Sequence, residues 1–134
     1  MACNEEGRIL GLAHIGVRVS DMEASLRFYT EILGFELTHR QKLGTTELAF
    51  LNIGTCLLEL IHPANYQPRE AGQVDHIAVE VKGIEPLVRR LKEKGVHFLS
   101  DEINHATALL DGVDNIFFTG PDGERIEFFD YVNR

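Results

Sequence analysis

His14-Ile15-Gly16-Val17-Arg18-Val19 decides the fold, because the chain repeats this stretch as His76-Ile77-Ala78-Val79-Glu80-Val81. In each copy apolar, mostly β-branched residues alternate with other side chains, as in a strand with one buried face, and a segment of helical spacing follows. Internal repetition of this kind indicates an architecture built from similar units. The sequence therefore predicts two modules, each of which begins with a strand that carries a histidine.

The repeat continues beyond these strands. Aligned without a gap from the two histidines, the halves also share identical residues in the strand and the helix that follows, at Ile15/Ile77, Val17/Val79, Val19/Val81, Glu23/Glu85 and Arg27/Arg89. Each half then ends in an apolar run that contains one glutamate, Glu59 in the first half and Glu127 in the second. Each module thus supplies one imidazole and one carboxylate in matched positions.

Strand and helix patterns give the first half the order βαβββ. Ser20 and Asp21 are typical helix caps, and Gly34 follows where the helix should stop. The predicted elements are a strand over Ile9–Val19, a helix over Met22–Leu33, and strands over Phe35–Lys42, Glu47–Ile53 and Cys56–His62. Module one therefore covers about residues 8–62, and the polar, proline-containing segment 63–73 is the predicted linker.

The second half repeats this order, with its least regular pattern between His97 and Gly112. The predicted elements are a strand over Asp75–Val81, a helix over Ile84–Lys94, and strands over Val96–Ser100, around Thr107–Leu110, over Asn115–Thr119 and over Arg125–Val132. Module two covers about residues 74–132. The predicted fold class is α+β, with two tandem βαβββ modules.

Length and composition exclude several classes of protein. At 134 residues, with 44% hydrophobic and 25% charged residues, the chain is a single domain over residues 1–134 whose halves, at roughly 60 residues each, need one another for a stable core. No apolar run approaches the ~20 residues that cross a bilayer, so we expect no membrane partner. The net charge of −8, without a basic cluster, argues against nucleic-acid binding.

The start of the chain and the cysteines suggest where the protein works. The first residues are acidic and show no secretory signal, so we expect a cytoplasmic protein. Cys3 and Cys56 are far apart in the sequence, and we interpret them as two free thiols.

Strand alternation brings the repeated residues onto shared faces. His14 and Arg18 lie on one face of their strand, and we expect both to point into one cavity. A lone histidine in a strand is more often a hydrogen-bonded core residue, and each glutamate alone could simply pair with a basic side chain. Matched positions in two copies favour a metal site instead, with His14, Glu59, His76 and Glu127 as the candidate ligands. Two imidazoles and two carboxylates suit a divalent ion, with nickel or zinc first and cobalt or manganese as alternatives.

The other histidines have no counterpart in the opposite half. We interpret them as surface or structural residues; they are His39, His62, His97 and His105.

With these residues in view, the chain resembles the vicinal oxygen chelate superfamily, which includes glyoxalase I, methylmalonyl-CoA epimerase and bleomycin resistance proteins. The resemblance covers about Leu12 to Tyr131. Its most specific segments, besides the first histidine strand, are Phe28–Phe35, Val74–Ala78 and Pro121–Glu127. It implies that paired βαβββ modules form an incomplete barrel around one divalent metal ion, and that His14, Glu59, His76 and Glu127 match the four ligand positions.

The resemblance also implies a type of reaction. Four retained protein ligands disfavour a ring-cleaving dioxygenase and a metal-free binding protein. They favour a glyoxalase I-like isomerase that converts the hemithioacetal of a 2-oxoaldehyde and a thiol, through a metal-bound enediolate, to a 2-hydroxyacyl thioester, as in methylglyoxal detoxification. By resemblance, Glu127 takes the proton and Glu59 lies on the opposite side of the substrate. Arg18 matches a position that contacts the carboxylate of the thiol cosubstrate, and an ordinary structural salt bridge is the alternative for it.

Two further functions stay open. Pro63 stands where glyoxalase I has an asparagine for glutathione, and the stretch Glu59–Pro63 resembles methylmalonyl-CoA epimerase, in which Glu47 would be a candidate second base. The second alternative is a non-catalytic protein that binds a small molecule such as an antibiotic. We expect a homodimer, and relatives build the site either within one chain or between two subunits.

Overall fold

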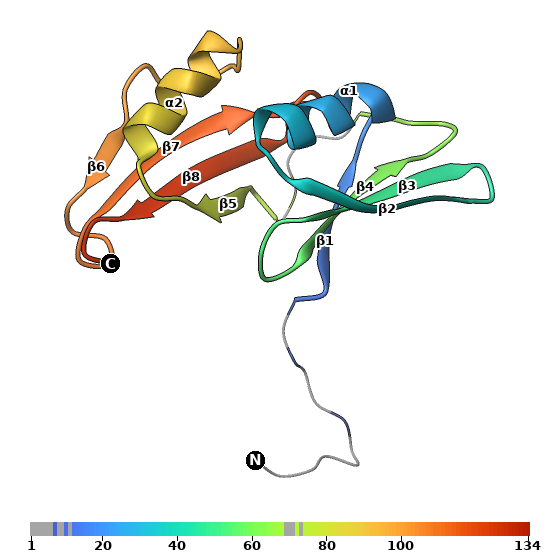
Figure 1. The fold of residues 1–134 in the computed structure, drawn as a ribbon, viewed down its shortest axis with the longest axis horizontal. Coiled ribbons are helices and arrows are strands. Elements are labelled where there is room, and N and C mark those ends of the chain that lie inside the picture. The colour runs from blue at the N-terminus through green and yellow to red at the C-terminus, as the bar shows by residue number, and fades with distance from the viewer. Residues whose placement is uncertain (1–6, 8–9, 11, 69–71, 73) are drawn as a thin grey trace.

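Two sheets of four strands form the structure, one sheet from each half of the chain (Figure 1). The structure is a computed structural model, and it describes residues 7, 10, 12–68, 72 and 74–134. The first module contains β1 (His14–Arg18), α1 (Met22–Leu26), the π-helical turn η1 (Arg27–Ile32) that continues α1, β2 (Glu36–Leu43), β3 (Thr46–Asn52) and β4 (Leu57–His62). The second contains β5 (Ile77–Glu80), α2 (Ile84–Glu93), β6 (Asn104–Ala106), β7 (Val113–Thr119) and β8 (Arg125–Tyr131).

The two sheets share one topology. Their strand orders are β1-β4-β3-β2 and β5-β8-β7-β6, so the histidine strand lies at one edge and beside the glutamate strand in both. β1 runs parallel to β4, and β5 runs parallel to β8. The α+β class and the two tandem βαβββ modules are thus confirmed. The strands described here form two separate sheets and no closed barrel.

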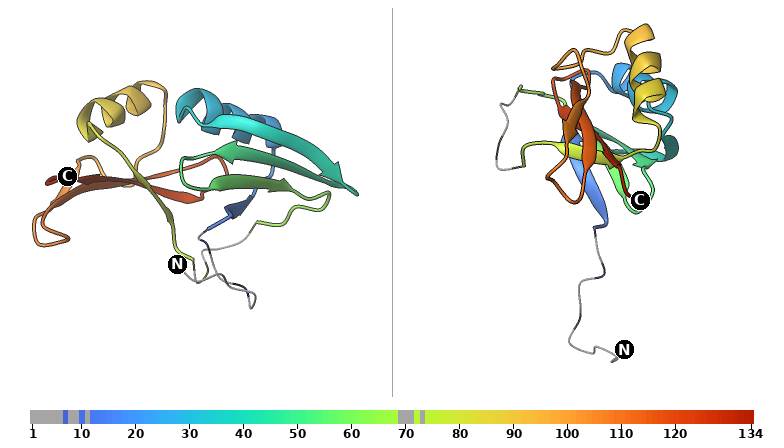
Figure 2. Two further views of the ribbon diagram at one scale, coloured as in Figure 1. Left: turned by 60° about the horizontal axis from the view of Figure 1, so that its bottom comes forward. Right: turned by 90° about the vertical axis from the view of Figure 1, so that its left-hand side faces the viewer.

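Both helices cover the same side of the sheets, which leaves the opposite side without a helix (Figure 2). α2 buries Ile84, Val88 and Leu91, which recur at the spacing of one helix face. In β4, Leu58 and Leu60 are 1% and 0% exposed and face this helical layer, so the residues between them face the open side. Strand alternation therefore separates an apolar core face from an open face in each module.

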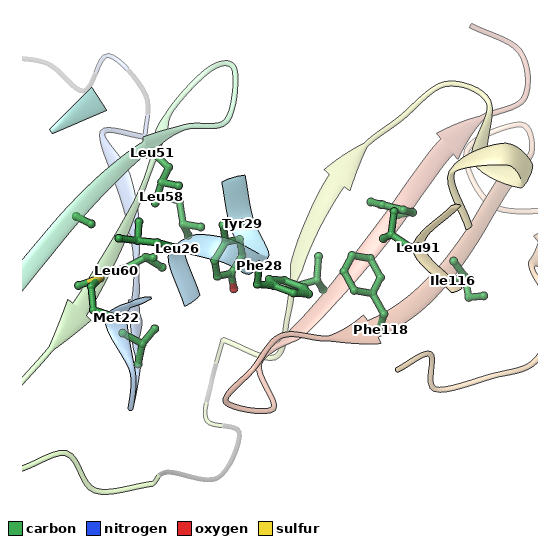
Figure 3. Close-up of a cluster of buried hydrophobic side chains, with 14 of the residues drawn as sticks. Met22, Leu26, Phe28, Tyr29, Leu51, Leu58, Leu60, Leu91, Ile116 and Phe118 are labelled. Atoms are coloured by element: carbon green, nitrogen blue, oxygen red, sulfur yellow. The ribbon is translucent and has the colours of Figure 1, made fainter. Parts of the chain in front are cut away.

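The core continues from one module into the other. Phe28 and Tyr29, in η1, lie between the buried leucines of module one and Phe118 of module two (Figure 3), and all belong to one cluster of buried residues. The Tyr29 hydroxyl donates to Glu124 Oε2 at 2.6 Å, and the Ser20 amide donates to Asp122 Oδ2 at 3.0 Å. The turn before β8 is therefore attached to the first helix of module one.

We expect Tyr29→Phe to lower the free energy of unfolding, because it removes the donor of a contact between the modules. A hydrogen bond to a charged group contributes about 1.5–3 kcal/mol. Burial, and then the charge of Glu124, raises the pKa of Tyr29 well above its usual value of 10.0. The stabilisation is therefore fully present below about pH 10 and is lost as the pH rises towards the higher pKa of the folded state.

Urea denaturation at neutral pH and near pH 11 measures this effect, and the difference between Tyr29→Phe and wild type should shrink at the higher pH. Tyr131→Phe, which removes a hydroxyl near the end of β8, is the matched control and should change stability by less than about 0.5 kcal/mol. Equal stability of the Tyr29 variant and wild type at neutral pH would contradict the expectation.

Several predicted boundaries are wrong. Val96–Ser100 is not a strand and makes only an isolated bridge from Phe98 to Phe118. The segment around Thr107–Leu110 is a turn in which Leu110 has a positive φ of 45°, so the chain reverses there instead of extending. The strand of this region is β6, which the pattern did not predict. The first helix is also not uniform, because it changes to π-helical geometry at Arg27.

The first strand of each module is shorter than predicted. β1 begins at His14, and β5 covers only Ile77–Glu80. Residues 9 and 11 of the predicted first strand, residues 69–71 and 73 of the linker, and Cys3 lie outside the described residues. Cys56 is a free thiol. No helix in the described part of the chain is long and apolar enough to cross a membrane.

Candidate functional site

His14 and Glu59 come together on the open face of module one. The parallel register of β1 and β4 sets Gly16 opposite Glu59, and His14 Nε2 lies 3.2 Å from Glu59 Oε1. A β-carbon at Gly16 would lie 3.7 Å from the same carboxylate oxygen and 3.2 Å from Ile61, so glycine keeps this part of the face open. The pair thus follows directly from strand register and alternation.

His76 and Glu127 repeat this geometry in module two. Ala78 lies opposite Glu127 in the parallel register of β5 and β8, and His76 Nε2 is again 3.2 Å from Glu127 Oε1. Ile126 and Phe128, on either side of Glu127, are 1% and 5% exposed and belong to the core, which directs the carboxylate to the open face. The structure therefore brings together the histidine and the glutamate of each half.

A phenylalanine accompanies each pair, and the repeat in the sequence does not mark either one. Phe50 lies opposite Glu59 in the β3–β4 register, and Phe117 lies opposite Glu127 in the β7–β8 register. The ring centroids of His14 and Phe50 lie 6.1 Å apart and those of His76 and Phe117 lie 5.0 Å apart, and in both pairs the rings are nearly perpendicular. The spacing from phenylalanine to glutamate differs between the halves, so an alignment without gaps does not show this match. The two rings give each pair an apolar wall.

The carboxylates are buried more deeply than the imidazoles. The side chains of Glu59 and Glu127 are 15% and 7% exposed, whereas those of His14 and His76 are 45% and 33% exposed. A buried carboxylate needs a partner, and a metal ion or a protonated imidazole would satisfy it. Imidazole nitrogen and carboxylate oxygen are ligands that zinc, nickel, cobalt and manganese accept. The chemistry of each pair therefore fits half of a four-ligand metal site.

One chain presents the four candidate ligands as two separate pairs. Among residues 7, 10, 12–68, 72 and 74–134, no three His, Cys, Asp or Glu side chains come together as a group that could hold a metal ion. Each pair is open to the side of the sheet that no helix covers. A site with all four ligands thus requires a second source of ligands for each pair.

Arg18 lines a cavity of about 320 Å³ between the modules, together with His76 and Arg125. The residues that line this cavity do not include His14, so the expectation that His14 and Arg18 share one cavity is not met. The Arg18 Nε atom is buried, and no described residue bonds to it. No ion pair of Arg18 is seen with the described residues, so the structural salt bridge considered for it is not observed there. Arg18 offers a cationic group to a ligand in this cavity.

Glu47 points away from the open face. It alternates in phase with Ala49 and Leu51, which are both 0% exposed, and its Oε2 accepts from Arg40 Nη2 at 3.0 Å. Arg40 also bonds Glu23 of α1 at 2.6 Å, and these hydrogen bonds raise the pKa of Arg40. Glu47 therefore has a structural role on the helical side of the sheet.

The histidines without a repeat counterpart contact other groups. His62 Nδ1 lies 3.0 Å from the Val19 carbonyl, and His105 Nδ1 lies 2.6 Å from Asp114. The His97 carbonyl accepts from the Thr119 amide. His39 lies 2.6 Å from Gln41 and has its ring 6.1 Å from Phe50, so it is on the open face of module one.

Comparison with known proteins adds an independent result. Residues 11–128 match the family model of the Glyoxalase/Bleomycin resistance protein/Dioxygenase superfamily. The chain is 32% identical over 126 residues to a lactoylglutathione lyase of Neisseria meningitidis, a match that covers 87% of this chain and 88% of that protein. It is 32% identical over 102 residues to mitochondrial methylmalonyl-CoA epimerase of Homo sapiens, a match that covers 69% of this chain and only 58% of the epimerase.

A solved structure shows the same fold. The crystal structure of a glyoxalase family protein from Enterococcus faecalis superimposes with a TM-score of 0.76 at 25% identity, over 90% of this chain and 97% of that one. The paired modules, the repeated histidine and glutamate positions and the family model agree. The chain belongs to the Glyoxalase/Bleomycin resistance protein/Dioxygenase superfamily.

Proposed function

We propose that the protein is a metal-dependent, glyoxalase I-like isomerase that acts on the hemithioacetal of a 2-oxoaldehyde and a thiol. Its site would contain His14 and Glu59 of one chain and His76 and Glu127 of a second copy, so that a homodimer holds two sites. The observation that carries this proposal is the repeated imidazole–carboxylate contact, which is 3.2 Å long in both modules and open on the same side of each sheet. A location in the cytoplasm stays a prediction.

The two pairs complement one another chemically. Each pair supplies one nitrogen and one oxygen ligand, and neither suffices for the four ligands that the superfamily resemblance implies. Because the open faces carry these pairs beside a phenylalanine, two such faces brought together would surround an ion with four ligands and two aromatic walls. Nickel or zinc fits this donor set best, and cobalt or manganese is the alternative.

The residues of the chain have distinct roles in this reaction. When bound, the divalent ion would act as a Lewis acid towards the substrate oxygens. Glu127, whose side chain is 7% exposed beside Phe117, takes the proton from the carbon next to the carbonyl and returns it to the neighbouring carbon. Glu59 lies on the opposite side of the substrate and completes the ligand set. Arg18 binds the carboxylate of the thiol cosubstrate from the cavity between the modules.

Methylmalonyl-CoA epimerase is the second candidate, because the chain is 32% identical to the human epimerase over 102 residues. An epimerase moves a proton between two faces of one carbon and uses a base on each face. Glu47, the additional base that the sequence offered, pairs with Arg40 on the helical side of the sheet. Glu47 is therefore not available as a second base on the open face, whereas the isomerase needs only Glu127 to carry the proton.

Assays with both substrate classes test the proposed function. We expect turnover of methylglyoxal combined with a low-molecular thiol, tested with glutathione and with other thiols because Pro63 replaces the glutathione-binding asparagine of glyoxalase I. Racemic methylmalonyl-CoA is the substrate of the second candidate function. Activity on it alone would show that the protein is an epimerase and not the proposed isomerase.

Metal removal provides a second expected result. Dialysis against a chelator should reduce turnover to background, and stoichiometric nickel or zinc should restore it, because the Lewis acid would be absent and then resupplied. Elemental analysis of the purified protein and of the reconstituted protein accompanies the assay. A protein that binds no divalent ion in calorimetry, yet binds small molecules, would instead be the non-catalytic binding protein.

A further inference from the structure

The two imidazole–carboxylate pairs differ in the neighbouring side chains that bond to them. The first of these neighbours contacts His76. Its Nδ1 lies 2.8 Å from Asp75 Oδ2. Because an ionised carboxylate only accepts hydrogen bonds, Nδ1 carries a proton, and in the neutral imidazole Nε2 then keeps its lone pair. Nε2 is the atom that lies 3.2 Å from Glu127 Oε1. The contact with Asp75 therefore leaves the nitrogen next to Glu127 available as a ligand.

Asp75 is itself fixed by a cation. Arg125 Nη1 donates to Asp75 Oδ1 at 3.2 Å and to Oδ2 at 3.3 Å. The Arg125 guanidinium also lies 5.1 Å from the centre of the Phe117 ring, the same ring that lies perpendicular to the His76 ring. Arg125, Asp75 and His76 thus form a chain of contacts around the aromatic wall of module two.

Glu127 is held on its other oxygen. Asn115 Nδ2 donates to Glu127 Oε2 at 2.7 Å, and Asn104 Nδ2 donates to Asn115 Oδ1 at 2.9 Å. The bond from Asn104 orients the Asn115 amide, because its oxygen is occupied and its nitrogen must face Glu127. Glu127 Oε2 is therefore anchored, while Oε1 faces His76 and the open side of the sheet.

Among the described residues of module one, neither of these supports is found. Ala13 precedes His14 where Asp75 precedes His76. Leu48 lies opposite Ile61, two residues past Glu59, whereas Asn115 lies opposite Phe129, two residues past Glu127. The positions that orient the pair of module two thus hold apolar residues in module one, and neither can donate to Glu59 or accept from His14.

We propose that Asp75 and Asn115 are positioning residues that preorganise the pair of module two, while the pair of module one adapts to the ion and the substrate. The proposal rests on the proposed function, because it treats each pair as half of a metal site. Partners that orient ligands typically contribute 10–100-fold to metal affinity. Asn115 would also keep the Glu127 carboxylate in place while Oε1 carries the proton, which is the geometry that a general base requires.

The tautomer of His76 in the metal-free protein tests the role of Asp75 without any metal. At about pH 8.5, where an ordinary imidazole is neutral, nitrogen-15 NMR of the ring should show the proton on Nδ1 of His76. Asp75→Ala should shift the proton to Nε2, and Asp75→Asn, which keeps an accepting oxygen, should partly restore the Nδ1 form. His76→Gln identifies the signal. A wild-type His76 with its proton on Nε2 would overturn this role.

Metal affinity tests both positioning residues. Calorimetric titration of the metal-free protein with zinc should show affinity about 10–100-fold weaker in Asp75→Ala and in Asn115→Leu, which copies the residue of module one. Asp101→Ala removes a carboxylate from the loop after α2, where the backbone oxygen of Asp101 accepts a hydrogen bond from Lys92, and should bind zinc as wild type does. Circular dichroism checks that all variants are folded.

The outcomes separate this inference from the proposed function. Folded Asp75 and Asn115 variants that bind zinc as tightly as wild type would overturn the positioning role and leave the isomerase intact. A wild-type protein without zinc or nickel affinity would overturn the isomerase and the predicted effect on affinity, while the tautomer measurement would still decide whether Asp75 orients His76.

Discussion

Glu127→Gln is expected to lower turnover by about 10²–10⁴-fold while the protein retains part of its metal affinity. Glutamine has nearly the shape of glutamate, and its carbonyl oxygen can still face the ion, but its amide cannot accept the proton of the substrate. The Glu127 side chain is 7% exposed and lies between the core residues Ile126 and Phe128. Turnover measured at saturating metal and substrate reports the loss of the base, and calorimetry reports the remaining affinity.

The matched control for this substitution is Glu93→Gln. Glu93 is the last residue of α2, on the side of the sheets that the helices cover, and its substitution removes the same charge away from the open face. It should leave turnover within about twofold of wild type. Rates near wild type in Glu127→Gln would remove Glu127 from the role of base, and complete loss of metal with loss of activity would assign it to binding alone.

The repeat in the sequence predicts which residues share a face but not how the faces meet. Strand alternation is a local property, so the contacts of His14 with Glu59 and of His76 with Glu127 follow from two strand patterns and a parallel register. The relation between the modules depends on Phe28, Tyr29 and the turn that carries Glu124, which are distant in the sequence. No local pattern encodes that relation, and it separates the two pairs within a chain.

The roles of Asp75 and Asn115 beside the second pair also could not be predicted from local sequence patterns. Asp75 is next to His76 in the sequence, but its role becomes visible only when β8 brings Arg125 to it. Asn115 was predicted to lie in a strand, yet its bond to Glu127 depends on the hairpin register of β7 and β8. β6 was not predicted because Asn104–Ala106 is short and polar, and such a strand has no alternating apolar pattern.

Mixing two inactive variants is expected to restore about a quarter of wild-type activity if the site is shared between subunits. His14→Ala removes a ligand of module one, and Glu127→Gln removes the base of module two, so each homodimer has a defect in both of its sites. In the mixed dimer, one site combines both defects. The other combines the intact module one of the Glu127 variant with the intact module two of the His14 variant.

The expected fraction follows from random assembly. When the variants are co-expressed in equal amounts, about half of the dimers are mixed and one of their two sites is intact, which gives about a quarter of all sites. Differently tagged copies allow the mixed dimer to be purified, and its rate should approach half that of wild type. The pair His76→Ala and Glu127→Gln is the control, because both defects lie in module two and no combination is intact.

This experiment decides between the two ways of assembling four ligands. If each chain built its own complete site by a rearrangement of its modules, every site would carry one defect, and mixing would restore nothing. The separation of the two pairs within the described chain argues against that assembly, since no third His, Cys, Asp or Glu side chain among the described residues joins either pair in a group that could hold a metal ion. Sedimentation showing only monomer at micromolar concentration, together with full activity, would refute the shared site, because a monomer would then have to supply all four ligands.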